Sequence, residues 1–159
     1  MNNPTTYSRT QIILHWVIVL LVLFQLVLHE GVQQAFQDRL HGVEVPLVNP
    51  HVVAGILVLL LVAWRLWLRL TRGTPALPET ESSIFKILAL ATHWLFYALL
   101  IIMPASGIAL WFFHLAPAGV THNLARWVLM ALILIHFAAA MMHHFVFRTN
   151  VLMRMLGRA

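Results

Sequence analysis

The chain has 159 residues, of which 61% are hydrophobic and only 9% are charged, a composition that excludes an ordinary water-soluble domain. It has no cysteine, so disulfide bonds, thiolate-bound iron–sulfur clusters and covalently attached c-type haem are excluded, while ten histidines remain as possible metal ligands. The formal net charge of +5 comes from basic residues at the ends of hydrophobic runs. That distribution indicates membrane topology rather than nucleic-acid binding.

The hydrophobic residues form four runs, each long enough to cross the roughly 30 Å hydrocarbon core of a bilayer as a helix. The runs cover residues 11–28, 51–70, 84–113 and 121–147. We therefore predict an all-α fold, an integral membrane four-helix bundle formed by residues 1–159 as a single domain. The polar residues 1–10 lack the pattern of a cleavable signal peptide, so the first span is expected to be retained.

The connections between the runs differ in character. Residues 30–50 are polar, but Val32, Phe36 and Leu40 recur at helical spacing, which indicates a short surface helix. Residues 71–83 are rich in glycine and proline and contain two acids, so a loop is expected there. The last connection, residues 114–120, is a short and uncharged turn.

Lysine and arginine are distributed unevenly between the two faces of the predicted bundle. One face carries Arg9, Arg65, Arg69, Arg72, Lys86, Arg148, Arg154 and Arg158. The opposite face carries Arg39 and Arg126. Because basic residues accumulate on the cytoplasmic side of membrane proteins, we predict that both termini are cytoplasmic.

Two histidines of the last run, His122 and His136, are fourteen positions apart in an otherwise apolar helix. Fourteen residues at about 100° each fall about 40° short of four turns, so the two imidazoles face nearly the same way, roughly 21 Å apart along the axis. A polar, titratable side chain in hydrocarbon needs a partner or a ligand bond. We therefore hypothesise that these imidazoles bind two haem irons at different depths.

The predicted depths sort four histidines into two pairs. His15 and His136 lie in the cytoplasmic half of the bundle, whereas His51 and His122 lie at the outer ends of their spans. We predict that each pair supplies the two axial ligands of one haem iron, as neutral imidazoles. Gly55, one turn after His51, would let a flat macrocycle approach the helix backbone.

Depth alone leaves other inner pairings open. His93 begins its span at a depth similar to that of His15. His143 is seven residues past His136 and faces within about 20° of it. A lone intramembrane histidine is more often a packing or proton-relay residue than a ligand, but two rows at matched depths favour ligation. The remaining histidines have plainer interpretations, as interfacial anchors for His143 and His144 and as solvated side chains for His29, His41 and His114.

Motifs distributed over nearly the whole chain match one known family. They are Tyr7-Ser8-Arg9, Leu14-His15-Trp16, His51-Val-Val-Ala-Gly55 followed by Arg65 and Arg69, His93 with Tyr97 and Pro104-x-x-Gly107, His122 with His136, and the His143-His144 pair before Asn150-x-Leu152-x-Arg154-Met155. With these motifs the chain resembles the bacterial cytochrome b561 family of small four-helix dihaem membrane proteins. The resemblance implies that His15, His51, His122 and His136 are the haem ligands.

The resemblance also implies a function, which is single-electron transfer through two haem b groups in the bacterial inner membrane, commonly to or from ubiquinone. One kind of member resembles a superoxide oxidase, a superoxide:ubiquinone oxidoreductase. The expected partners are membrane lipid, quinone and a small one-electron donor or a redox protein. Arg126, one turn after His122, could pair with a haem propionate, attract an anion, or extend to the interface. His93, Arg65 and Arg69 are candidates to contact the quinone head group or its protons.

Two other classes of function fit parts of the sequence. The chain could be the haem-bearing membrane anchor of a dehydrogenase or hydrogenase complex, although its short outer loops speak against a large docking surface. A proton or metal path through a small transporter would use the same histidines without a tightly bound chromophore. The short connection at residues 114–120 also departs from superoxide-oxidising members, which carry a longer segment there.

Overall fold

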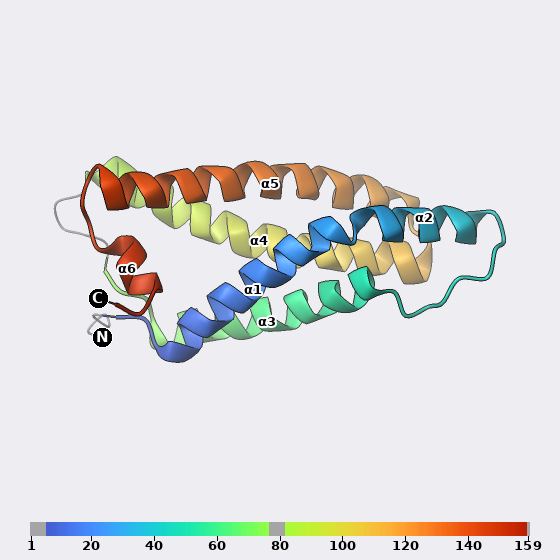
Figure 1. Ribbon diagram of the computed structural model, residues 1–159, viewed down its shortest axis with the longest axis horizontal. Helices are drawn as coiled ribbons and strands as arrows, with labels where there is room; N and C mark the ends of the chain where they lie inside the picture. The colour runs from blue at the N-terminus through green and yellow to red at the C-terminus, as the bar shows by residue number, and fades with distance from the viewer. Residues whose placement is uncertain (1–5, 77–81, 159) are drawn as a thin grey trace.

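The computed structural model describes residues 6–76 and 82–158. The helices of this part are α1 (Arg9–Val27), α2 (His29–Leu40), α3 (Pro50–Arg72), α4 (Ser83–Phe113), α5 (Ala116–Phe145) and α6 (Val151–Met155). Helices α1, α3, α4 and α5 are long and apolar enough to cross a membrane, and they run along the long axis of the molecule (Figure 1). The predicted all-α fold with four membrane-length helices is confirmed.

The helix bounds agree with the predicted runs except at the start of α5. Helices α1, α3 and α4 begin and end within two residues of the predicted spans. Helix α5 begins at Ala116, five residues before the predicted start, with Pro117 in its first turn, where the missing N–H of proline costs nothing. Most of the turn predicted at residues 114–120 is therefore helix.

The two longer connections agree with their predictions as far as the structure describes them. The predicted surface helix is α2, which spans His29–Leu40. In the predicted loop 71–83, residues 73–76 and 82 are not helical, while α3 extends to Arg72 and α4 begins at Ser83. Residues 77–81, which include Pro78, lie outside the described residues, as do residues 1–5 of the polar lead.

Short polar motifs begin α1 and α3, the helices that carry His15 and His51. Ser8 and Gln11 form a reciprocal capping box at the start of α1. At the start of α3 the Asn49 Oδ1 atom accepts a hydrogen bond of 2.9 Å from the backbone N–H of His51. Because Asn49 fixes the first turn of α3, the backbone of His51 is fixed at the end of the bundle.

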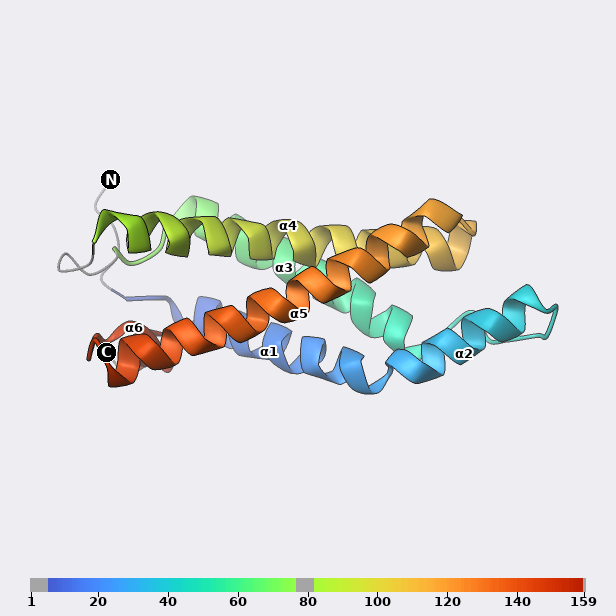
Figure 2. The same cartoon turned by 90° about the horizontal axis from the view of Figure 1, so that it is seen from above.

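The two ends of the bundle are built differently (Figures 1 and 2). One end carries α6, the described termini and the connection from α3 to α4. The other end carries α2, the segment after it and the turn between α4 and α5. The described termini therefore lie on the same side, as the predicted topology requires, and the assignment of that side to the cytoplasm stays a prediction from the basic residues.

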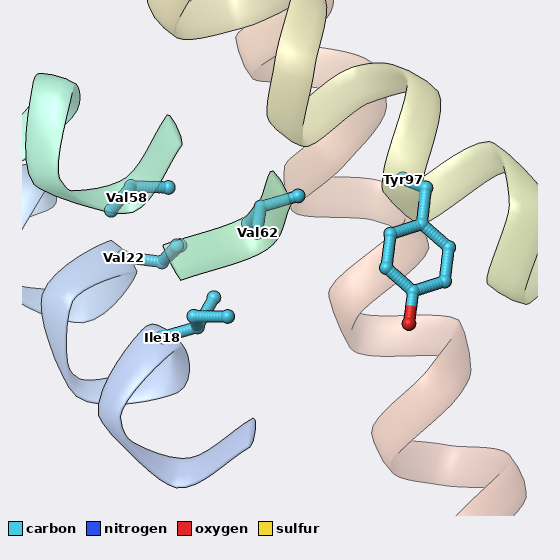
Figure 3. Close-up of a cluster of buried hydrophobic side chains, with 5 residues drawn as sticks. All are labelled: Ile18, Val22, Val58, Val62 and Tyr97. Atoms are coloured by element: carbon cyan, nitrogen blue, oxygen red, sulfur yellow. The ribbon is translucent and has the colours of Figure 1, made fainter. Parts of the chain in front are cut away.

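Two clusters of buried side chains hold the long helices together. Ile18 and Val22 of α1 pack with Val58 and Val62 of α3 (Figure 3), and the same buried cluster includes Tyr97 of α4. A second cluster joins α4 to α5 through Leu99, Ala125, Leu129 and Leu132. Packing therefore proceeds from α1 to α3, from α3 to α4 and from α4 to α5, whereas α5 does not pack extensively on α1 or α3 within the described residues.

Candidate functional site

A cavity of about 410 Å³ lies at the end of the bundle that carries α2. Its lining includes His51 and Gly55 of α3, Gly107 of α4, and His122 and Arg126 of α5. The volume lies in the range of about 300–1,000 Å³ that is usual for cofactor and small-molecule sites. Because α3 and α5 pack little against each other, the space between their histidines is free to receive a flat molecule.

His51 and His122 face each other in this cavity, with ring centres 6.3 Å apart. Two imidazoles that bind one metal ion from opposite sides have ring centres about 6 Å apart, because each metal–nitrogen bond is about 2 Å long. The spacing therefore fits a shared iron. The structure brings together the two residues that the sequence paired at the outer end.

The His122 ring is oriented by α4. Its Nδ1 atom donates to the carbonyl oxygen of Met103 over 2.8 Å, and the Ser106 Oγ atom lies 3.5 Å from the same nitrogen. With Nδ1 protonated, Nε2 keeps the lone pair that binds a metal. A Cβ atom at Gly107 would lie 3.1 Å from His122 Cε1, so this glycine lets the ring lie against α4. Sequence reasoning noted Gly107 only as part of a motif.

The surroundings of His51 differ from those of His122. Within the described residues, His51 Nδ1 is buried and has no hydrogen-bond partner, and the same holds for Gln25 Oε1. The Gln25 Nε2 atom donates to the backbone oxygen of His51 over 3.1 Å. A Cβ atom at Gly55 would lie 3.2 Å from Gln25 Nε2. Gly55 therefore makes room for the Gln25 amide as well as lining the cavity.

Arg126 is tied down at the rim of the cavity. Its guanidinium donates to His29 Nε2 and, over 2.8 Å, to Asn123 Oδ1, and it lies 5.0 Å from the centre of the Trp127 ring. Burial and the adjacent Arg126 cation lower the pKa of His29. His29, which was predicted to be a solvated side chain, is partly exposed and also accepts a hydrogen bond from Arg126, because the start of α2 places it there.

Four further histidines, His41, His114, His143 and His144, lie near the ends of the bundle and away from the cavity. His41 and His114 are exposed, as predicted. His143 Nδ1 lies 3.2 Å from Thr149 Oγ1, and the His143 and His144 rings each contact a neighbouring phenylalanine ring.

Three histidines gather in the other half of the bundle. The rings of His93 on α4 and His136 on α5 have centres 5.8 Å apart, and His15 on α1 interacts electrostatically with both. The His93 Nδ1 atom donates to the carbonyl oxygen of Ala89 over 2.6 Å. The structure thus brings three of the four inner candidates together, whereas His143 contacts Thr149 and Phe147. This geometry leaves both His15–His136 and His93–His136 as possible pairs.

The two arginine candidates lie near these histidines, among aromatic side chains. Arg65 donates to the backbone oxygen of Gln11 and hydrogen-bonds to Tyr97. Arg69 lies 5.8 Å from the centre of the Tyr97 ring. Burial raises the pKa of the Tyr7 hydroxyl, and the positive charges of Arg65 and Arg69 oppose that rise. Tyr7 therefore lies near Arg65 and Arg69, although the sequence showed it only as part of the Tyr7-Ser8-Arg9 motif.

A family model described as prokaryotic cytochrome b561 matches residues 6–158. The chain belongs to the prokaryotic cytochrome b561 family. It is 34% identical over 158 residues to cytochrome b562 of Cereibacter sphaeroides, covering 98% of each chain. It is 28% identical over 174 aligned positions to a probable superoxide oxidase, CybB, of Yersinia pestis, covering 96% of each chain.

Membership of the cytochrome b561 family gives the site its general chemistry. The chain is a membrane electron-transfer protein of the bacterial inner membrane, with four membrane-length helices. Membership of a cytochrome b family implies that the chain binds haem b. The donor set of neutral imidazoles, the glycine beside each of two facing histidines and the cavity between them fit that group at the outer end.

Proposed function

We propose that this protein holds two haem b groups and passes single electrons between a donor at its outer face and ubiquinone in the membrane. The observation that carries the proposal is the pair His51 and His122, whose ring centres lie 6.3 Å apart across a cavity. When bound, the haems would supply reversible one-electron chemistry, and a pair of histidines would hold each of them. The whole chain would act as a single unit.

For the inner haem we propose His15 and His136 as ligands. The outer pair joins α3 to α5, two helices that pack little on each other, and His15 and His136 likewise join α1 to α5. His93 and His136 lie instead on α4 and α5, which are held in direct contact by a buried cluster. A macrocycle is accommodated more easily between helices that are not already packed together.

At the outer end, the proposed role of Arg126 is to attract or position an anionic donor. Its guanidinium is held at the cavity rim by His29 and Asn123, so its charge has a fixed position. Superoxide is one candidate donor, because a relative bears the name of a superoxide oxidase. With that donor, oxidation of two superoxide ions to two O₂ would accompany the reduction of one quinone, with two protons, to quinol.

In the opposite half, the proposed quinone contacts are His93, Arg65 and Arg69. His93 keeps Nδ1 on the Ala89 carbonyl, so its Nε2 is left to accept or deliver a proton. Arg65 is hydrogen-bonded to Tyr97, and Arg69 lies over the same ring. These fixed donors would orient a quinone carbonyl that enters from the lipid.

Haem content tests the proposal directly. Protein purified from haem-replete cells should bind two b-type haems per chain by pyridine-haemochrome assay and give low-spin spectra on reduction. In proteoliposomes with quinone in the lipid, a one-electron donor added at the outer face should reduce the haems and then the quinone. A folded but colourless preparation would contradict the proposal, and haem reduction without quinone reduction would remove only the quinone part.

A further inference from the structure

Gln25 of α1 lines the cavity between His51 and His122. We infer that Gln25 is a positioning residue for His51, whose Nδ1–H donates to Gln25 Oε1 when Nε2 binds iron. The inference rests on the proposed function, because it requires His51 to be a haem ligand.

These two neighbouring side chains each carry one unpaired polar atom. Among the residues that the structure describes, Gln25 Oε1 and His51 Nδ1 are the buried side-chain polar atoms without a hydrogen-bond partner. One is an acceptor, and the other is a donor whenever Nε2 carries the lone pair. The two residues already touch, since Gln25 Nε2 donates to the backbone oxygen of His51 over 3.1 Å. Buried polar atoms are rarely left unpaired, so a state that joins these two is favoured.

The two outer imidazoles differ in whether Nδ1 has a hydrogen-bond partner. His122 has its Nδ1 partner in the Met103 carbonyl at 2.8 Å, whereas within the described residues His51 Nδ1 has none, and the His51 ring interacts with the backbone of Gln25. A metal-bound histidine almost always donates its second ring N–H to an acceptor, which fixes the ring and makes the ligand nitrogen more basic. Rotation of the His51 ring about its Cβ–Cγ bond has a broad energy minimum, so ligand binding can turn Nδ1 toward the amide oxygen at little cost.

Gly55 explains how the amide comes so close to α3. The Gln25 side chain is 9% exposed, and a Cβ atom at position 55 would lie 3.2 Å from its Nε2. An alanine there would force the amide to shift by a few tenths of an ångström. On the other side of the cavity, a Cβ atom at Gly107 would instead meet the His122 ring at 3.1 Å. The two glycines therefore offer matched substitutions that disturb Gln25 and His122 separately.

The experiment is a redox titration of the purified, haem-loaded protein, with the outer haem identified as the component lost in His51→Ala. Gln25→Leu removes the acceptor, so His51 becomes a weaker donor to iron and the outer midpoint potential should rise. Gln25→Glu supplies a stronger acceptor, so the same potential should fall. We expect each shift to be about tenfold in the equilibrium constant for reduction, about 59 mV for one electron. The inner haem should not shift, and it serves as the internal control.

Gly55→Ala gives a second and independent test. It should raise the outer potential as Gln25→Leu does. Its shift should be smaller in a protein that already carries Gln25→Leu, because the part that acts through the Gln25 amide is then already lost and only the effect on the cavity lining remains. Gly107→Ala, which disturbs His122, should add its full effect in the same background. The comparison of Gly55→Ala with Gly107→Ala in the Gln25→Leu background tests the role of Gln25 even if Gln25→Glu fails to fold.

The outcomes separate the inference from the proposed function. A wild-type protein without an outer haem contradicts the proposed function and the inference together. A wild-type protein with both haems, in which Gln25→Leu leaves the outer potential unchanged or Gly55→Ala adds its full effect to Gln25→Leu, overturns only the role of Gln25. Shifts of the same sign for Gln25→Leu and Gln25→Glu also overturn it, since a packing effect would not reverse sign.

Discussion

Arg39 of α2 is fastened to Trp111 of α4 in two ways. Its Nη1 atom donates to the Trp111 carbonyl oxygen over 2.9 Å, and its guanidinium carbon lies 4.8 Å from the centre of the Trp111 ring. The Trp111 Nε1 atom in turn donates to the backbone oxygen of Leu47 over 3.1 Å. Since α2 lines the outer cavity through His29 and Phe36, these bonds hold a surface helix over the site.

The first prediction concerns this fastening. Arg39→Gln removes the cation–π contact, about 1 kcal/mol for a partly buried pair, so α2 should open about fivefold more often. Reduction of the outer haem by dithionite, followed by stopped-flow absorbance, should accelerate by a similar factor. Arg9→Gln, an exposed arginine at the other end, is the matched control. Equal rates for Arg39→Gln and wild type would show that α2 does not limit access.

The second prediction concerns the outer ligands. His51→Ala and His122→Ala should each remove the same component from a redox titration and leave the other, because an iron held by two imidazoles loses its geometry when either bond is removed. His114→Ala, an exposed histidine on the same end, should keep both components. Loss of different components in the two variants would mean that the pairing is wrong.

The third prediction decides between the two inner pairings. His15→Ala and His136→Ala should each abolish the inner haem signal, whereas His93→Gln should retain both haems and slow quinone reduction by about a hundredfold, the lower end of what a lost general acid–base group costs. Pyridine-haemochrome stoichiometry and quinone reduction in proteoliposomes measure the two effects. If His93→Gln loses a haem and His15→Ala does not, the inner ligands are His93 and His136.

The fourth prediction concerns charge at the outer face. Arg126→Glu should slow haem reduction by superoxide about tenfold at low salt and less at high salt, because screening weakens attraction between charges more than about 10 Å apart. Arg158→Glu, an exposed charge reversal at the opposite end, should have little effect. A loss of rate that is independent of salt would argue that Arg126 acts by structure and not by attraction.

The fifth prediction is a pH effect at His29. Burial and Arg126 lower its pKa below the ordinary value of 6.5, with Glu30 opposing the shift. The unfolded chain therefore binds more protons at this residue than the folded one just below pH 6.5, so the contact loses stability as the pH falls through that region. Thermal unfolding of wild type and His29→Gln between pH 7.5 and 5 should show a smaller acid loss in the variant. Identical pH profiles would exclude this contribution.

Sequence patterns located what depends on position along a helix. Hydrophobic length located the four spans, and depth grouped His51 with His122 because their helices place them at the same end. Depth could not decide the inner pair, since His15 and His93 lie at one level and only the lateral packing of α4 on α5 distinguishes them.

Contacts between side chains on different helices could not be predicted from the sequence either. Gln25 is one amide in an apolar run, and nothing in its spacing shows that it reaches the backbone of His51 on another helix. The Gly107 contact with His122 has the same lateral character, although the Pro104-x-x-Gly107 motif was a signal that something specific occurs there. The early start of α5 could have been read from Pro117, which suits a first helical turn.

Within residues 6–76 and 82–158, α5 packs little against α1 or α3, and this has a consequence for biogenesis. In the described part of the chain, α5 is held to the bundle mainly by its packing on α4. Contact between α5 and the helices α1 and α3 therefore depends on a cofactor that fills the space between the histidines. A newly inserted chain that has not met its cofactor should therefore keep a loosely attached last span, open to membrane proteases. The steady-state amount of this protein in the cell should follow haem supply.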